Sequence, residues 1–172
     1  MEYRHVHYWQ YEPGDAEEVV LERALSLCQK GRHDALLSEI ASFITEQTGV
    51  KFLLIGRLSD DLQHIHTLVF MEDGKAMENY TYSLKGTPCD QTLLQRFCYY
   101  PFGVAPCFPE DKDLEDLQIE SYLGSMLLSE DNEPIGLVAL MDTKQIDKAA
   151  FAEHLIMVLS PAIEEEIKMM RL

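Results

Sequence analysis

Three of the four cysteines lie in one stretch of the chain, as Cys89, Cys98 and Cys107, among aromatic and small residues. Thiols spaced in this way could bind a metal, hold a cluster or take part in redox chemistry. None of them belongs to a C-x-x-C pair, and no histidine–cysteine metal motif accompanies them. Small buried thiols packed among aromatic rings are the simpler interpretation.

Two other groups of polar residues are of types that bind cations. His64 and His66 lie two apart, so they share one face of an expected strand, but no third ligand is evident. The acidic run from Glu110 to Asp116 lacks the D-x-D-x-D-G spacing of a calcium loop, and acids at the start of a helix explain it. The sequence has no Ser-His-Asp order, no glycine-rich phosphate loop and no His-x-x-x-His helix. It therefore predicts no catalytic residue and no metal site.

Aromatic rings, hydroxyls and thiols are concentrated between residues 82 and 124. Such residues suit a flat or amphipathic ligand, which the rings would stack on and the hydroxyls would anchor. Packing of the same residues in a core would account for them equally well. The candidate ligand-binding residues are Tyr82, Thr87, Cys89, Cys98, Tyr99, Phe108 and Tyr122.

The length of 172 residues predicts one domain, 15–172, preceded by a tail, 1–14, that has no periodic pattern and ends in a Pro-Gly turn signal. The formal charge of −16, from 30 acidic and 14 basic side chains, argues against nucleic acid and against an anionic membrane surface as partners. No apolar run reaches the length of a membrane span, and the first residues do not resemble a signal peptide. We therefore expect a cytoplasmic protein with reduced thiols.

The spacing of apolar residues predicts the elements that would position these side chains. Two helices, 15–31 and 36–49, should open the domain, and a long helix, 147–172, should close it. Strands are expected at 50–58, 64–71, 76–84, 120–128 and 134–142, the first three joined by tight turns and so antiparallel. A short helix after Thr87 should turn Leu93, Leu94 and Phe97 inward, and another follows Phe108.

This order of elements predicts an α+β fold with an antiparallel sheet of five or six strands. The first two helices and the last should cover one face of the sheet. A layer of loops and short helices, 82–117, should cover the other. Within the last helix, Pro161 cannot donate to the Met157 carbonyl, which predicts a kink.

Five blocks in the second half of the chain resemble those of GAF domains, which are small-molecule sensor modules related to PAS domains. The resemblance is closest to the GAF domains of bacterial sensor histidine kinases and cyclic-dinucleotide enzymes. It covers about residues 34–167 and departs from the pattern at Met126, where the family usually has proline, and at Asn132, where it often has glycine. The matching blocks are 82–89 (Tyr-Ser-Leu-Lys-Gly-Thr-Pro-Cys), 98–101 with Val104, 108–111, 120–124 and 134–137.

The resemblance implies a non-catalytic domain that senses a small molecule, or otherwise regulates bacterial signal transduction, together with an output domain or kinase. It names no ligand and no cofactor. A free methionine sulfoxide reductase is the enzymatic alternative, although that group's Gly-x-Val-Cys-Gly and His-Ile-Ala-Cys-Asp blocks are absent. So are the Cys-His dipeptide of bilin-binding GAF domains and the signature of cyclic-nucleotide GAF domains. A dimerisation or interaction module without a ligand is the third possibility.

The resemblance also implies a homodimer formed through the terminal helices. Their apolar residues would leave a stripe partly exposed on a monomer, which soluble proteins usually cover. Three consecutive acids, Glu164 to Glu166, should lie on the solvent side and would repel their copies across a two-fold axis. The residues of the expected stripe are Val20, Ala24, Leu27, Leu159, Ile163, Ile167 and Met170.

Overall fold

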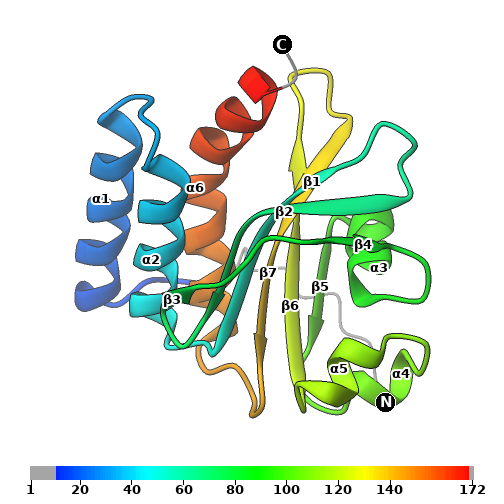
Figure 1. The fold of residues 1–172 in the computed structure, drawn as a ribbon. Coiled ribbons are helices and arrows are strands. Elements are labelled where there is room, and N and C mark those ends of the chain that lie inside the picture. The colour runs from blue at the N-terminus through cyan, green and yellow to red at the C-terminus, as the bar shows by residue number, and fades with distance from the viewer. Residues whose placement is uncertain (1–10, 171–172) are drawn as a thin grey trace.

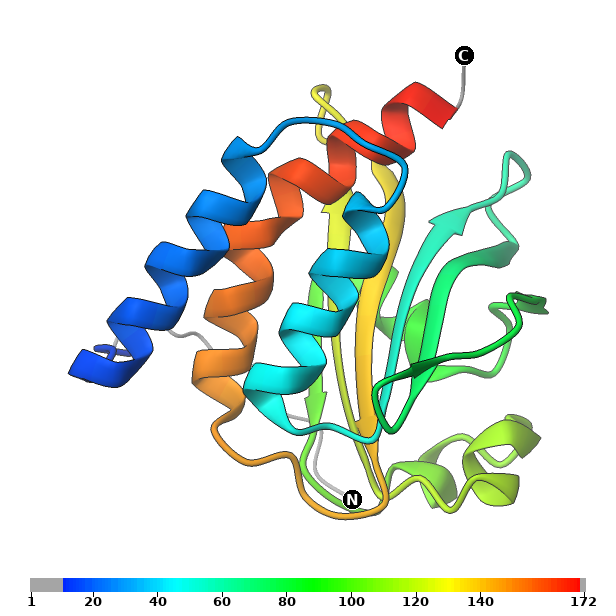
Figure 2. The same ribbon diagram turned by 60° about the vertical axis from the view of Figure 1, so that its left-hand side comes forward.

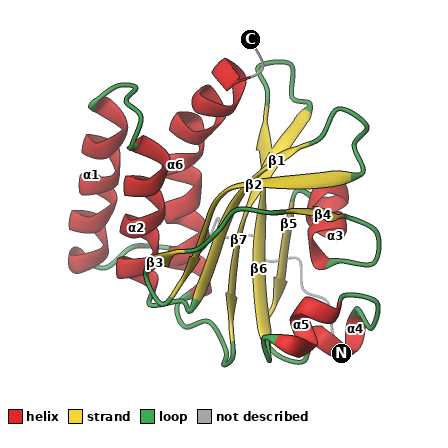
Figure 3. Ribbon diagram, in the orientation of Figure 1, coloured by secondary structure: helices red, strands yellow, loops and turns green. Residues whose placement is uncertain are grey.

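A central antiparallel sheet separates two groups of helices in the computed structural model, which describes residues 11–170 (Figure 1). Most of the expected tail, residues 1–10, lies outside the described residues. Three long helices cover one face of the sheet, and short helices with their loops cover the other (Figure 3). This confirms the predicted α+β architecture.

The strands follow the order β3-β2-β1-β7-β6-β5, with β4 beside β2, and every pair is antiparallel. Within residues 11–170 the structure has seven strands, where the sequence predicted five or six. One predicted strand is divided in two, and one strand was not predicted. The bounds are β1 Phe52–Leu58, β2 His64–Glu72, β3 Lys75–Ala76, β4 Thr81–Ser83, β5 Phe97–Tyr100, β6 Ser121–Leu128 and β7 Pro134–Asp142.

The expected single strand at 76–84 is wrong, because side chains replace part of the backbone ladder between β3 and β4. Thr67 Oγ1 accepts a hydrogen bond from the Tyr80 N–H at 2.8 Å and donates to Asn79 Oδ1 at 3.0 Å. Asn79 Nδ2 in turn donates to the Leu68 carbonyl at 3.1 Å. Asparagine and threonine side chains compete in this way with regular pairing.

The unpredicted strand β5 corrects the expectation for the short helix after Thr87. This helix, α3, spans Pro88–Gln95, and Arg96 then adopts a φ of 72°, which ends the helix. Phe97 therefore begins β5 and pairs with Ser125 of β6 instead of lying on a helix. Leu94, expected to face inward, is 71% exposed.

The three long helices agree with the predictions: α1 spans Asp15–Gln29, α2 spans Leu36–Thr48 and α6 spans Ala149–Met170. Gly49 ends α2 with a φ of 70°, a conformation that glycine adopts without strain. Figure 2 shows that the last part of α6 leans away from the axis of its first part, as expected for a helix with Pro161 in its interior. Asn132, in the β6–β7 turn where GAF domains often have glycine, has a left-handed conformation with a φ of 61°, which asparagine tolerates.

The apolar stripe that was expected to be partly exposed on the terminal helices is instead mostly buried. Ala24, Leu27, Leu159, Ile163 and Ile167 are all buried within the chain, because α1 and α2 both pack on α6. Val20 is half-buried, and Met170 is the exposed member of the set. The apolar surface of these helices is therefore used mainly to build this domain.

The acids Glu164 and Glu166 also differ from the expectation of a solvated face. The buried Glu166 carboxylate accepts a hydrogen bond from Arg32 Nε at 2.9 Å, which ties the α1–α2 connection to α6. Glu164 Oε2 accepts one from the Leu128 N–H at 2.5 Å, at the end of β6. Both acids therefore hold α6 to the rest of the domain.

Glu153, near the start of α6, should make the stability of the protein depend on pH. Among residues 11–170, its Oε2 is a buried side-chain oxygen that accepts no hydrogen bond. Burial raises the pKa of this carboxyl from 4.5 to about 8. The folded state therefore binds more protons than the unfolded state between these two values, so stability should fall as the pH rises through this window.

We expect Glu153→Gln to raise the melting temperature clearly at pH 8.5 and to change it little at pH 4.5, as measured by differential scanning calorimetry. Glu165→Gln, at an exposed position of the same helix, is the matched control. An effect of Glu153→Gln that is equal at both pH values would contradict the assignment.

Candidate functional site

A small cavity of about 40 Å³ lies between the sheet and the layer formed by α3 and α5 (Lys112–Asp116). Its sheet side carries Leu54, Met141 and four aromatic rings, Phe70, Tyr80, Tyr82 and Tyr122. The helical layer contributes Pro88, Cys89, Asp111, Asp113, Leu114 and Leu117, with Ile119 just after α5. The site is therefore largely apolar, with a few polar groups placed inside it, as is usual for small-molecule sites.

Three predicted site residues, Tyr82, Cys89 and Tyr122, meet in this cavity. The Tyr82 hydroxyl donates to Cys89 Sγ at 3.1 Å, and the Tyr122 hydroxyl lies 3.2 Å from the same sulfur. Thr92 Oγ1 lies 3.0 Å from the Tyr122 hydroxyl and 3.2 Å from the Pro88 carbonyl. The polar groups of the cavity wall thus bond to one another and are already positioned.

The Cys89 thiol is buried in the cavity wall, and its surroundings disfavour the thiolate. Burial raises its pKa to about 11, and hydrogen bonds from Tyr122 and Tyr82 offset only part of that shift. The thiol is therefore protonated near neutral pH, whereas nucleophilic and redox cysteines act as thiolates. Burial also raises the pKa of Tyr82 and of Tyr122 well above the usual value, so both keep their protons.

Two of the other predicted site residues do not line the cavity but lie in the structure on the same side of the sheet. Thr87 caps α3, accepting from the Asp90 N–H at 3.3 Å and donating to the Leu84 carbonyl at 2.6 Å, which fixes where Pro88 and Cys89 lie. Cys98 is fully buried in the core on the same side of the sheet.

Phe108 and Tyr99 lie apart from the cavity. Phe108 packs edge-on against Tyr100 at 5.5 Å, and Tyr100 in turn contacts the ring of Tyr122. Tyr99 belongs to the core on the opposite face of the sheet, where its hydroxyl donates to the Ile146 carbonyl at 3.2 Å. Neighbouring strand residues face opposite sides, so Cys98 and Tyr99 could not both face this cavity.

Ten of the residues that line the cavity were not among the predicted site residues, and four of these ten are aromatic or charged: Phe70, Tyr80, Asp111 and Asp113. Tyr80 could have been found, because it alternates with Tyr82 in the sequence. The two aspartates were interpreted as solvated acids at a helix start, and only the packing of α5 brings them to the cavity. Burial, and then the neighbouring Asp113, raises the pKa of the Asp111 carboxyl.

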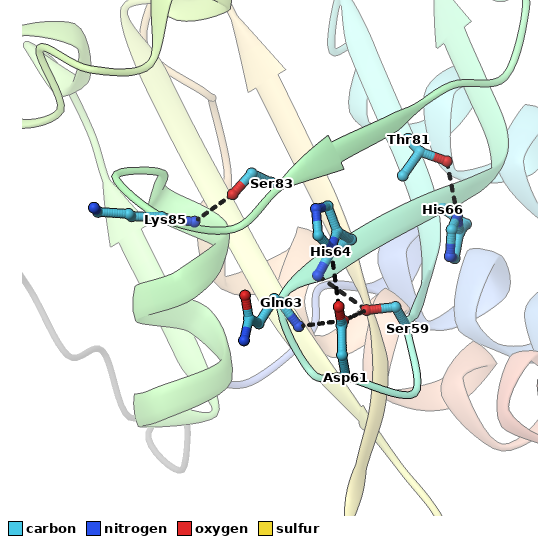
Figure 4. A network of polar contacts seen from close by, with 8 residues as sticks. All are labelled: Ser59, Asp61, Gln63, His64, His66, Thr81, Ser83 and Lys85. Carbon is cyan, nitrogen blue, oxygen red and sulfur yellow. Dashed lines mark hydrogen bonds and ion pairs between the residues drawn. The ribbon is translucent and has the colours of Figure 1, made fainter.

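His64 and His66 both lie on β2 and do not line the cavity, and each contacts its own neighbour (Figure 4). His64 Nδ1 is 3.5 Å from Asp61 Oδ2, and His66 Nδ1 is 2.7 Å from Thr81 Oγ1. Within residues 11–170, no three His, Cys, Asp or Glu side chains are grouped closely enough to hold a metal ion. Across the same residues, no helix is long and apolar enough to span a membrane.

A larger and more open hollow of about 370 Å³ lies between α6 and the β6–β7 hairpin. Leu128, Ile135 and Pro161 form its apolar part, and Glu164 and Lys168 are among its charged residues. It holds none of the predicted site residues, so size alone does not locate the candidate site in this protein.

No protein-family model and no curated protein sequence matches the chain. Solved structures do match it. The GAF domain of a phosphoenolpyruvate-protein phosphotransferase from Acinetobacter has a TM-score of 0.68 at 10% identity, over 91% of this chain and 96% of the other. The chromophore-binding domain of a bacteriophytochrome from R. palustris has a TM-score of 0.70 at 10% identity, over 93% of this chain.

This chain spans 64% of the length of that R. palustris protein. A free methionine-R-sulfoxide reductase from Neisseria meningitidis, solved with its substrate, has a TM-score of 0.67 at 13% identity, over 94% of this chain and 95% of the other. The TM-scores establish that the fold is shared. Sequence identities this low leave the activity of this chain open. The matches cover more than nine tenths of this chain at TM-scores of 0.67 to 0.70, and the chain therefore has the fold of a GAF domain.

Proposed function

We propose that this chain is a non-catalytic sensory or regulatory domain of a cytoplasmic signalling system, and that it binds a small molecule in the cavity beneath α3 and α5. The observation that carries the proposal is the cavity itself. Its walls are aromatic, its inner polar groups are fixed by mutual hydrogen bonds, and its thiol is held protonated. These features favour recognition of a ligand over chemistry on it.

A free methionine sulfoxide reductase is the second candidate, because one structure of that activity shares the fold. It requires a reactive thiolate, and burial opposes ionisation of Cys89. Thiol-dependent reduction of free methionine sulfoxide that is lost in Cys89→Ser would overturn the non-catalytic proposal. Retention of that activity in Cys89→Ser would assign it to another group.

Blocking the cavity is the direct test of ligand binding. Leu117 lies in its wall, so Leu117→Trp should fill the space, whereas Leu94→Trp adds the same ring at an exposed site. We expect native mass spectrometry to find a ligand on the wild type and on Leu94→Trp, and none on Leu117→Trp, with both variants folded by circular dichroism. The same ligand on Leu117→Trp would place binding elsewhere.

A regulatory role also needs a connection from the cavity to the rest of the protein. Strand β6 supplies one, because Tyr122 lies in the cavity near one end of it and Leu128 binds Glu164 of α6 at the other. Glu164→Ala should speed hydrogen exchange at the Leu128 amide and cost about 1–3 kcal/mol of stability. Glu164→Gln keeps an acceptor and should restore most of the protection. Unchanged exchange in Glu164→Ala would remove this connection.

We also propose a homodimer through α1 and α6, with an output domain or kinase as a further partner. The large apolar side chains that stay exposed on these two helices are Val19 and Leu25 on α1 and Met157 and Met170 on α6, with Val19 and Met157 the most exposed at 56% each. Val19→Glu and Met157→Glu should therefore weaken a dimer without disturbing the core, unlike changes at the buried Leu159 and Ile163. Sedimentation at tens of micromolar tests this, and a monomeric wild type would end the proposal.

A further inference from the structure

The charged groups that line the cavity have one sign. Asp111 and Asp113 both reach it from the start of α5, and the residues that line it include no lysine, arginine or histidine. The chain as a whole carries a formal charge of −16, which adds to the attraction for cations. Anionic ligands such as nucleotides or carboxylic acids would meet uncompensated repulsion here.

The neighbouring wall is aromatic and continuous. The rings of Phe70 and Tyr80 meet edge-on with centroids 5.5 Å apart, and Tyr80 and Tyr82 follow at 5.5 Å. Aromatic faces beside carboxylates are the arrangement that attracts alkylated ammonium groups, because the ring quadrupole and the negative charge act together on a cation that sheds its water easily. Lysine-like hydrated amines gain less from such a wall.

We infer that the ligand is a small organic cation whose alkylammonium head lies against Phe70, Tyr80 and Tyr82 and is neutralised by Asp111 and Asp113. This inference rests on the proposed function and names the ligand class of the same cavity.

The electrostatics of the site agree with this assignment. Two carboxylates that face the same partly buried space repel one another, and a bound cation relieves the repulsion. Burial, then Asp113 and other nearby groups including Asp111, raises the pKa of the Tyr80 hydroxyl, as expected when both carboxylates lie close to that ring.

The size of the cavity sets the size of the head group. About 40 Å³ accommodates a few water molecules. A methylated ammonium head is of this order. An extended chromophore or a nucleotide base requires far more space than these walls enclose.

Three probes that each carry a trimethyl group and differ in charge separate the possibilities: trimethylammonium, tert-butanol and pivalate. Titration of the full chain, followed by chemical-shift changes of aromatic protons, should show saturable binding of trimethylammonium at least about 10-fold tighter than of either other probe. Asp111→Asn and Asp113→Asn should each weaken it about 10-fold. Asp116→Asn, at an exposed position of α5 that does not line the cavity, should leave it unchanged.

The outcomes distinguish the ligand class from the function. Failure of trimethylammonium to bind, or binding that neither aspartate variant weakens, overturns the cationic ligand. If tert-butanol or pivalate then binds and Leu117→Trp abolishes that binding, the sensory cavity stands with another ligand class. If Leu117→Trp changes the binding of none of the three probes, the proposed function fails as well.

Discussion

Replacing Gly136 with alanine is expected to destabilise the protein by about 3 kcal/mol, the upper range for overpacking a core. A Cβ atom at this position of β7 would lie 2.2 Å from the carbonyl oxygen of Gly56 in the paired strand β1. That oxygen belongs to the backbone, so it cannot move aside without opening the β1–β7 ladder. Urea unfolding followed by circular dichroism would measure the loss.

Gly14→Ala is the control for this substitution. No atom lies within 4 Å of a Cβ built there, and we expect a loss of under about 1 kcal/mol from its place before α1. Equal losses in the two variants would show that general glycine effects, and not the close approach of Gly56 and Gly136, set the cost.

Truncating Tyr122 to alanine should cost about 3–5 kcal/mol, as large aromatic truncations in cores do. Its side chain is fully buried at the centre of the cavity-side core and contacts Tyr100, Cys89 and Thr92. Tyr122→Phe keeps the ring and removes only the hydroxyl, so it should cost about 1 kcal/mol. Thermal and chemical unfolding of the two variants would separate packing from hydrogen bonding.

Phenol provides a second measurement on Tyr122→Ala. The substitution leaves a cavity of the shape of the missing ring, so phenol should raise the melting temperature of this variant more than that of the wild type. Tyr80→Ala, at the exposed edge of the aromatic wall, should cost much less. A loss in Tyr122→Ala as small as that in Tyr80→Ala would contradict the central position given to Tyr122.

The sequence alone determined the features that depend on local chemistry. Apolar spacing predicted α1, α2 and α6, because a helix that packs on a sheet must repeat its apolar residues every three to four positions. Turn residues predicted the antiparallel order of the strands, and Pro161 predicted the bend in α6. Tyr80 and Tyr82 alternate in the sequence, and the structure has both of them in the cavity wall.

The candidate site could be predicted only in part, because its position depends on side chains that meet from distant segments. Tyr82, Cys89 and Tyr122 were predicted and lie together, but Tyr99 faces the opposite side of the sheet. Strand β5 was missed because its four residues are too few to establish an alternation of their own, and pairing with β6 is what defines them as a strand.

Tertiary structure decided the remaining features, because each depends on which surfaces meet. Asp111 and Asp113 have the sequence signature of solvated helix-start acids, and only the packing of α5 over the sheet makes them the charged part of a cavity. The apolar residues of α1 and α6 have the same spacing whether they pair with a second copy or with each other. Docking of both helices against this domain's own core is what buries Ala24, Leu159 and Ile163.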